Sequence, residues 1–267
     1  MTTEPHANLT TRWVAGLIVL ILADAAQLLW IYPGRTDELW AWPIQPELTS
    51  TVLASAYIGG GYFFARVLFG APWHRVAAGF PPVVLFVWMA AIATFAHLDR
   101  FTTDSLPFAT WIALYVLTPV GVPLLYLSNR DRVPAERGPR LPLGVRRALA
   151  VAGGAIVAGG LAMLAAPQPF IDGWPWTLTP LTARIVAAVL ALFGSVWVSV
   201  AVDGTRAGAR IPLEGHAIGL AALLLALARG HGDVDWGDPA APLLAAIAAA
   251  MGLVSLALSR RQPAHRR

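Results

Sequence analysis

Two short stretches of this chain place a histidine two residues before an aspartate, each at the end of an apolar run. "FAHLDRF", residues 95 to 101, contains His97 and Asp99, and "RGHGDVDW", residues 229 to 236, contains His231 and Asp233. Imidazole and carboxylate groups bind divalent metal ions, and an imidazole with a pKa near 6.5 can relay protons. Two such histidines could also hold a haem axially. The structural alternative, which we favour, is a histidine that complements a helix C-terminus, followed by a water-facing aspartate.

A second candidate site lies within the first apolar run. Asp24 falls inside this run, and Gln27 follows one helical turn later on the same face. A carboxylate at membrane depth needs a partner, a proton or a water-filled cavity. The functional interpretation is a site for a coupling ion or a proton, and the alternative is a protonated Asp24 hydrogen-bonded between helices.

The composition identifies the solvent in which these groups must work. The chain has 267 residues, of which 57% are hydrophobic and 13% charged, with a mean hydropathy of +0.62. Ordinary soluble domains carry about 25% charged residues, so this composition is typical of a membrane protein. Cysteine is absent, which excludes disulfides, thiolate metal sites and cysteine nucleophiles. No basic patch with interleaved aromatic residues is present, so we expect no nucleic-acid partner.

Apolar runs long enough to cross a bilayer predict an all-α integral membrane protein. A hydrocarbon core about 30 Å thick needs roughly 20 apolar residues per helix. Eight segments qualify, at about residues 12–32, 49–70, 75–97, 108–128, 147–166, 180–202, 211–229 and 240–259.

The arginines predict the orientation of these eight helices. With the N-terminus in the cytoplasm, 15 of the 19 arginines fall on the cytoplasmic side. The opposite side holds only Arg35, Arg100, Arg184 and Arg229, together with nine acids. We therefore expect a multi-pass protein of the bacterial cytoplasmic (inner) membrane, with both termini in the cytoplasm and the bilayer as its partner.

The order of the motifs predicts an internal duplication. "WPIQPELT" from Trp42 and "WPWTLTPLT" from Trp174 each lead into a helix. A His-x-Asp site follows the last threonine of each motif at nearly the same spacing, 48 residues from Thr49 to His97 and 49 residues from Thr182 to His231. A unit of four helices crosses the membrane an even number of times, so both copies must have the same orientation. The prediction is two parallel four-helix repeats, residues 1–128 and 147–267, the second with a basic C-terminal tail, joined by a cytoplasmic Arg/Pro-rich linker at 129–146.

Tryptophans mark the outer boundary of both predicted repeats. Trp42 and Trp174 stand beside Trp40 and Trp176, and Trp236 follows the last His-x-Asp site. Tryptophan normally anchors helices at the level of the lipid headgroups. These residues could instead line a vestibule for a lipid or an apolar solute, but anchoring is the interpretation we favour.

The motifs "WPI-x-P" and "HLDRF" give the chain a resemblance to other proteins. A helix that begins after "WPI-x-P" and a next helix that closes with "HLDRF" resemble a group of uncharacterised multi-span membrane proteins from bacteria with high-GC genomes. The resemblance covers most of the chain and implies a polytopic inner-membrane location. It implies no activity, cofactor or site residue.

Two further polar or helix-breaking features complete the pattern. "TPVGVP", residues 118–123, should kink or locally open the fourth helix. Broken helices occur near transporter substrate sites, but they also occur in membrane proteins that transport nothing, which is the interpretation we favour. Between the sixth and seventh helices the polar residues Asp203, Arg206, Arg210, Glu214 and His216 are interpreted as a solvated loop with local ion pairs.

No G-x-S-x-G, H-E-x-x-H, Walker or dinucleotide-binding motif occurs, so the sequence neither identifies an enzyme nor predicts a cofactor. The leading hypothesis is a transporter or permease for a small solute or ion, with Asp24 and Gln27 near a path between the repeats. The alternatives are a metal- or haem-binding protein that uses His97 and His231, and a membrane scaffold without chemistry of its own. Small-residue surfaces on the fifth and eighth helices leave open a homo-oligomer.

Overall fold

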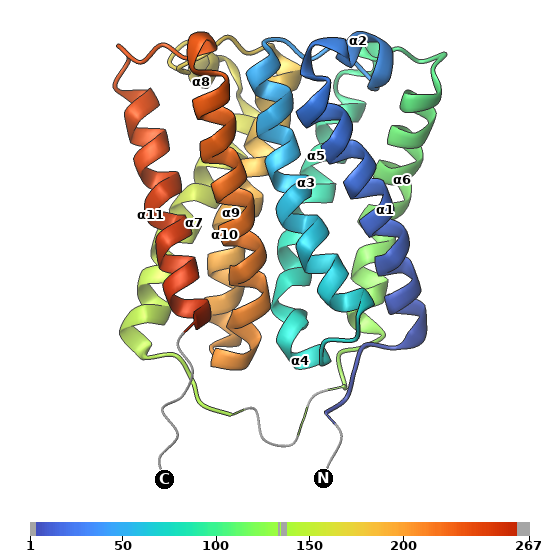
Figure 1. Cartoon of the computed structure of the whole chain (residues 1–267), viewed down its shortest axis with the longest axis vertical. Coiled ribbons are helices and arrows are strands. Elements are labelled where there is room, and N and C mark those ends of the chain that lie inside the picture. The colour runs from blue at the N-terminus through green and yellow to red at the C-terminus, as the bar shows by residue number, and fades with distance from the viewer. Residues whose placement is uncertain (1–3, 133, 135–137, 261–267) are drawn as a thin grey trace.

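The computed structural model describes residues 4–132, 134 and 138–260. Within these residues eight helical segments are long and apolar enough to cross a membrane, as the sequence predicts (Figure 1). They are α1 (Leu9–Ile31), α3 (Glu47–Leu68), α4 with α5 (Trp73–Phe95), α6 (Leu106–Leu127), α7 (Leu143–Ala165), α9 (Pro180–Asp203), α10 (Arg206–Arg229) and α11 (Ala240–Arg260). Short helices such as α2 (Thr36–Leu39) and α8 (Gln168–Ile171) lie between them.

Local sequence explains where several of these helices begin. Asn8, Ser105, Thr179 and Thr205 each accept a hydrogen bond from a backbone N–H of the first turn of the helix that follows. Thr179 and Thr182 form a reciprocal pair at the start of α9, in which each hydroxyl bonds a backbone N–H of the other's residue.

The eight spans differ in how much of each is buried inside the protein. In α3, α5, α9 and α10, between 61% and 67% of the most apolar stretch is buried, against 17% to 22% in α1, α6, α7 and α11. Reading along the chain, the spans are outer, inner, inner, outer, and then the same again. The outer helices offer their remaining apolar surface to the bilayer, which a membrane protein can do at no cost.

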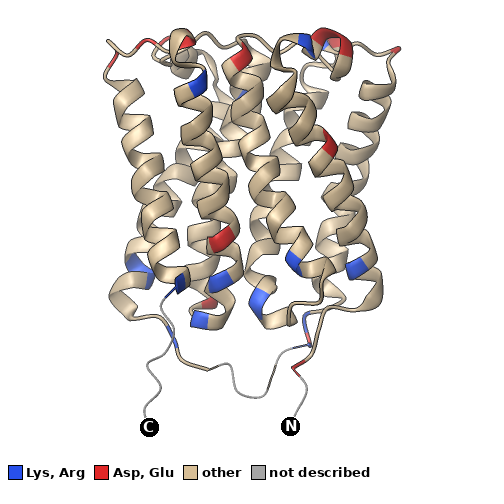
Figure 2. Cartoon of the chain, viewed as in Figure 1, with Lys and Arg blue, Asp and Glu red and all other residues tan. Residues whose placement is uncertain are grey.

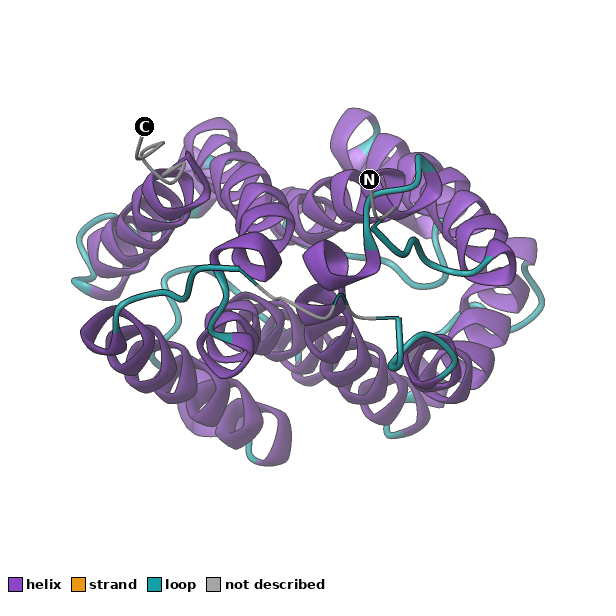
Figure 3. Ribbon diagram, turned by 90° about the horizontal axis from the view of Figure 1, so that it is seen from below, coloured by secondary structure: helices purple, strands orange, loops and turns teal. Residues whose placement is uncertain are grey.

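The packing partners follow the same order in the first half of the chain (α1 to α6) and the second (α7 to α11). Within the first half α1 packs on α3 and α5 on α6, and within the second α7 packs on α9 and α10 on α11. Between the halves, α3 packs on α10 and α5 on α9. Figure 1 shows the two halves side by side, and Figure 3 shows all the long helices running roughly along one axis.

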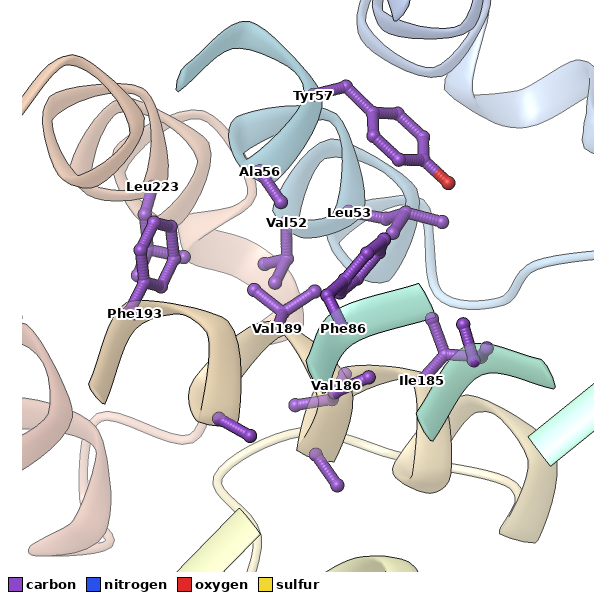
Figure 4. Close-up of a cluster of buried hydrophobic side chains, with 14 of the residues drawn as sticks. Val52, Leu53, Ala56, Tyr57, Phe86, Ile185, Val186, Val189, Phe193 and Leu223 are labelled. Atoms are coloured by element: carbon purple, nitrogen blue, oxygen red, sulfur yellow. The ribbon is translucent and has the colours of Figure 1, made fainter. Parts of the chain in front are cut away.

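The contact between the halves includes a dry apolar cluster. Val52 and Leu53 of α3 lie against Ile185, Val186 and Val189 of α9, and all five side chains are buried (Figure 4). These branched side chains fill the space between the two inner helices and hold the halves together.

The charges separate between the two ends of the bundle (Figure 2). The first residue of α1 and the last of α11 lie at the same end of the bundle. This end carries most of the arginines, drawn in blue, and we call it the basic end. Most of the described acids lie at the opposite end. The predicted asymmetry of charge is therefore present in three dimensions.

Two predictions about the basic end need correction or restriction. The five polar residues from Asp203 to His216 do not form a solvated loop, because α9 ends at Asp203 and α10 already begins at Arg206. A predicted local ion pair is present, since Arg210 Nε lies 2.9 Å from Glu214 Oε1. Positions 133 and 135–137 of the predicted linker and the tail at 261–267 lie outside the described residues. The described end of the linker does pack on the protein: Leu141 N donates to the Gly204 carbonyl, and Arg206 N donates to the Pro139 carbonyl.

The predicted opening of the fourth span is not seen. α6 is one continuous helix from Leu106 to Leu127 with Pro119 and Pro123 inside it. A proline removes the hydrogen bond to the carbonyl four residues earlier without forcing the helix to end.

Candidate functional site

A cavity of about 160 Å³ lies inside the membrane-spanning part of the first half. Its walls come from α1, α3, α5 and α6 and, across the contact between the halves, from α9 and α10. A cavity of about 150 Å³ lined by apolar side chains is large enough to hold a benzene ring. The space is therefore large enough for a small ring system or part of a chain.

Aromatic side chains form much of this wall. Tyr57 of α3 lies edge-on to Phe86 of α5, with ring centroids 6.4 Å apart. The ring centroids of Tyr115 and Trp111, both on α6, lie 4.3 Å apart. Figure 4 shows Tyr57 and Phe86 projecting from neighbouring helices. Rings arranged in this way favour a flat, apolar occupant, because they offer both faces and edges for stacking.

The wall contains no Asp, Glu, Arg or Lys. Its few polar groups are side chains that can donate a hydrogen bond. Trp111 Nε1 donates to Thr94 Oγ1 at 2.9 Å, and Thr118 Oγ1 donates to the Leu114 carbonyl at 2.6 Å, so these two are satisfied within the protein. Trp40 Nε1 and His216 Nε2 are buried with no hydrogen-bond partner among the described residues.

Two of the outer helices, α1 and α6, flank one side of the cavity. At the basic end these helices are joined through Asn129, whose Nδ2 donates to Thr11 Oγ1 at 2.7 Å and whose Oδ1 accepts from Asn8 N at 2.7 Å. Over the rest of their length α1 and α6 make few direct contacts. An occupant could reach the cavity from the bilayer along this side.

Asp24 and Gln27, the predicted polar pair, are not part of this wall. Both are exposed on the outer surface of α1, whereas Leu22 and Ala25 of the same helix line the cavity. The predicted role of Asp24 at a solute path gains no support from this geometry.

His97 and Asp99, the first His-x-Asp site, meet arginines. His97 Nε2 lies 2.6 Å from Nη1 of Arg184 on α9, and Asp99 Oδ2 lies 3.0 Å from Nε of Arg100. Partial burial, and after it the charge of Arg184, lowers the pKa of His97. A histidine held neutral against a guanidinium is poorly placed to attract a cation.

His231 and Asp233, the second site, line a polar pocket at the opposite end from the basic one. The pocket has a volume of about 470 Å³ and also includes Glu47 and Arg229. Asp233 Oδ2 accepts a hydrogen bond from Leu48 N at the start of α3, at 3.3 Å. This is the structural role of an aspartate at a helix N-terminus.

The described part of the chain contains no group of three or more His, Asp or Glu side chains that could hold a metal ion. His97 contacts α9 and His231 stands in a pocket beside α3, so the two sites have different surroundings. The geometry gives the metal and haem hypothesis no support.

The tryptophans predicted as headgroup anchors have different environments. Trp42 is only 2% exposed and packs on Trp111, with ring centroids 4.8 Å apart, so it is a core residue and not an anchor. Trp174 is partly buried and lies 5.1 Å from Trp176. Trp236 is 45% exposed, as an anchor would be.

The groups that line the cavity were largely missed by the sequence reasoning. His216 was assigned to a solvated loop, yet it stands near the middle of α10, within the apolar run "GHAIGLAALLL". A histidine surrounded by apolar and small residues at mid-membrane depth is the signal that could have identified it. Tyr57 and Tyr115 carry no comparable signal.

Comparison with protein-family models, with curated proteins and with solved structures found no match to this chain.

Proposed function

We propose that this chain is a permease-like protein of the bacterial inner membrane, which takes a small, uncharged and largely apolar solute into the cavity of its first half. The observation that carries the proposal is the cavity itself, which is aromatic, free of charged side chains and bordered by helices of both halves. A charged solute would lose its hydration there without gaining a counter-charge. The scarcity of direct contacts between α1 and α6 supports access from the bilayer.

We further propose that the two halves are parallel repeats. Three observations support this: the order of outer and inner helices is the same in each half, the packing partners correspond, and each half begins at the basic end. The contact of α3 with α10 would then be the counterpart of the contact of α9 with α5. The excess of arginine at the basic end supports a cytoplasmic location for that end.

Binding can be measured by equilibrium dialysis of 2-methylnaphthalene against the protein in nanodiscs, with protein-free nanodiscs to subtract partition into lipid. We expect saturable binding that Leu114→Trp reduces at least tenfold, because Leu114 lines the cavity and the larger ring fills it. Leu117→Trp is the matched control, since Leu117 lies one turn along α6 and is 68% exposed. Binding that does not saturate, or that both variants reduce equally, would overturn the proposal.

Passage can be measured as entry of 3-(2-naphthyloxy)propane-1,2-diol, an uncharged molecule with an apolar body, into proteoliposomes. We expect entry faster than into protein-free vesicles, and slowed by Leu114→Trp but not by Leu117→Trp. Asp24→Asn should leave entry unchanged, because Asp24 faces away from the cavity. Normal binding with no acceleration of entry would reduce the proposal to a binding protein.

A further inference from the structure

His216 is the most deeply buried ionisable side chain in the cavity wall. It belongs to α10, ten residues after the helix begins, and is 3% exposed. Its ring lies edge-on to the ring of Phe193, with centroids 5.5 Å apart, and its centroid lies 6.1 Å from that of Trp197. Phe193 and Trp197 both belong to α9. The imidazole is therefore fixed between two inner helices at membrane depth.

A hydroxyl group determines which nitrogen of His216 carries the proton. Ser255 Oγ of α11 lies 2.9 Å from Trp197 Nε1 and 2.8 Å from His216 Nδ1. An indole N–H can only donate, so Ser255 accepts from Trp197. Among the described residues the remaining partner for the hydroxyl hydrogen is His216 Nδ1, which must then accept, and a neutral imidazole carries its proton on Nε2.

The resulting Nε2–H is a buried donor without a well-placed acceptor. No described residue makes a well-formed hydrogen bond to it. The backbone of Phe193 offers it only a weak contact, which a better-placed carbonyl of a bound molecule could replace. An unpaired polar group in the bilayer is costly, and proteins usually satisfy such groups. His216 belongs to the cavity wall, but its Nε2 atom is covered, so a bound molecule reaches it only after a neighbouring side chain of the wall moves aside.

Other unpaired groups in the wall are also donors. Trp40 Nε1 is buried without a partner. The hydroxyl oxygens of Tyr57 and Tyr115 lie 3.5 Å apart, and in such a pair only one of the two protons is used, so the second is free to donate. A wall that offers donors, no charge and aromatic faces is complementary to a neutral molecule with acceptor oxygens on a flat apolar body.

We propose that the solute is an uncharged planar carbonyl compound, of the quinone class, and that His216 Nε2–H donates a hydrogen bond to one of its carbonyl oxygens. Ser255 is a positioning residue, which sets the tautomer of His216 and does not touch the solute. This inference rests on the proposed function, because it assigns the chemistry of the same cavity.

Two probes of nearly the same shape separate the carbonyl inference from simple apolar binding. Menadione, 2-methyl-1,4-naphthoquinone, carries two carbonyls that 2-methylnaphthalene lacks. Their dissociation constants are measured by equilibrium dialysis with the full-length protein in nanodiscs. We expect menadione to bind about tenfold more tightly, after correction for its partition into lipid, as one net hydrogen bond predicts.

The decisive variants change only the donor. His216→Phe keeps a ring but removes the N–H, and should weaken menadione binding about tenfold while changing the affinity for 2-methylnaphthalene less than about twofold. His216→Gln places an amide N–H near the position of Nε2 and should recover part of the loss. Ser255→Ala should give a smaller loss for menadione alone, because the tautomer is then no longer imposed.

The wild-type protein supplies a test that does not depend on any variant folding. With ¹³C-labelled menadione, the infrared carbonyl stretch of the bound molecule should shift to lower wavenumber relative to menadione in lipid, as a hydrogen-bonded carbonyl does.

An unshifted band, or equal losses for both probes in His216→Phe, overturns the carbonyl inference. If 2-methylnaphthalene still binds saturably and Leu114→Trp still reduces that binding, the proposed function survives the failure of the carbonyl inference. If neither probe binds saturably, both proposals fall.

Discussion

The two halves of this protein close their helix pairs by opposite means. In the second half, α7 and α9 meet through glycines: a Cβ on Gly153 would lie 2.5 Å from the Gly194 carbonyl, and one on Gly194 would lie 2.7 Å from the Gly153 carbonyl. In the first half the corresponding pair, α1 and α3, is separated by side chains, and the glycines Gly16 and Gly60 face the flexible ends of Leu68 and Leu22. One half is closed backbone to backbone, while the other keeps room between its helices.

The same difference appears between the inner helices. In the second half α9 and α10 pack on each other directly, whereas α3 and α5 make few contacts and enclose the cavity with rings such as Tyr57 and Phe86. Small residues allow close approach in a membrane, where dispersion contacts and not hydrophobic transfer hold helices together. Large rigid rings do not pack so closely. The comparison teaches that the same order of outer and inner helices gives a closely packed second half and a first half that contains a cavity.

The largest expected effect follows from the glycine contact of the second half. Gly153→Leu should destabilise the protein by about 3 kcal/mol or more, because its side chain would meet the backbone of α9, which cannot move aside. Gly154→Leu is the control, since a Cβ there meets nothing within 4 Å. Unfolding in mixtures of sodium dodecyl sulfate and a mild detergent measures both. Equal stability of the two variants would show that α7 and α9 do not approach this closely.

A single type of substitution should have opposite effects in the two halves. Gly160→Ala places a Cβ 2.8 Å from the Ala187 carbonyl and should cost about 1–3 kcal/mol. Gly60→Ala places one 3.3 Å from Leu22 Cδ1, a movable methyl, and should stabilise α3 by about 0.5–1 kcal/mol, since glycine is a poor helix former. The same detergent titration compares them, and two changes of equal sign would contradict the contrast drawn above.

A smaller difference is expected at the end opposite the basic one, where a tryptophan of each half is buried. Trp176 Nε1 donates to Thr49 Oγ1 at 3.1 Å, whereas Trp42 Nε1 has no partner among the described residues. Both Phe variants lose similar volume, but Trp176→Phe also leaves the buried hydroxyl of Thr49 without its donor. It should therefore be about 1 kcal/mol less stable than Trp42→Phe. Adding Thr49→Ala to both should remove most of that difference.

How much of this the sequence could predict depends on the length scale of the signal. The eight spans were predicted to within a few residues, for example 12–32 against Leu9–Ile31, because an apolar run of this length has few alternatives in a membrane. The arginines also predicted that positive and negative charges would separate between the two ends of the bundle, as most of them do. The sequence motifs lie at helix ends, where their polar residues can have a structural role without any ligand. Asp233, for example, accepts a hydrogen bond from Leu48 N at the start of α3.

The cavity could not be predicted, because it depends on which faces of distant helices meet. His216 acquires its surroundings from Trp197 and Ser255, 19 and 39 residues away, and Tyr57 from Tyr115 on α6. A pattern along one helix carries no information on such pairs. The prediction for Asp24 fails to gain support for the same reason. An acid inside an apolar run indicates that the residue lies within the membrane, but the packing of α1 on α3 decides whether it faces the protein or the outer surface.

The smallest expected effect is the pH dependence of the contact between His97 of the first half and Arg184 of the second. The pKa of His97 is lowered in the folded protein, mainly by burial and then by Arg184, so the folded state resists protonation more than the unfolded state does. Its stability contribution is fully present above the ordinary histidine pKa near 6.5 and is lost as the pH falls from there toward the lowered value. We expect the free energy of unfolding to fall between pH 7.5 and pH 5, and His97→Gln to flatten that slope. Arg184→Gln should flatten the slope less, because burial is the larger cause of the lowered pKa. If the wild type and His97→Gln had the same slope, His97 would not be a source of the pH dependence.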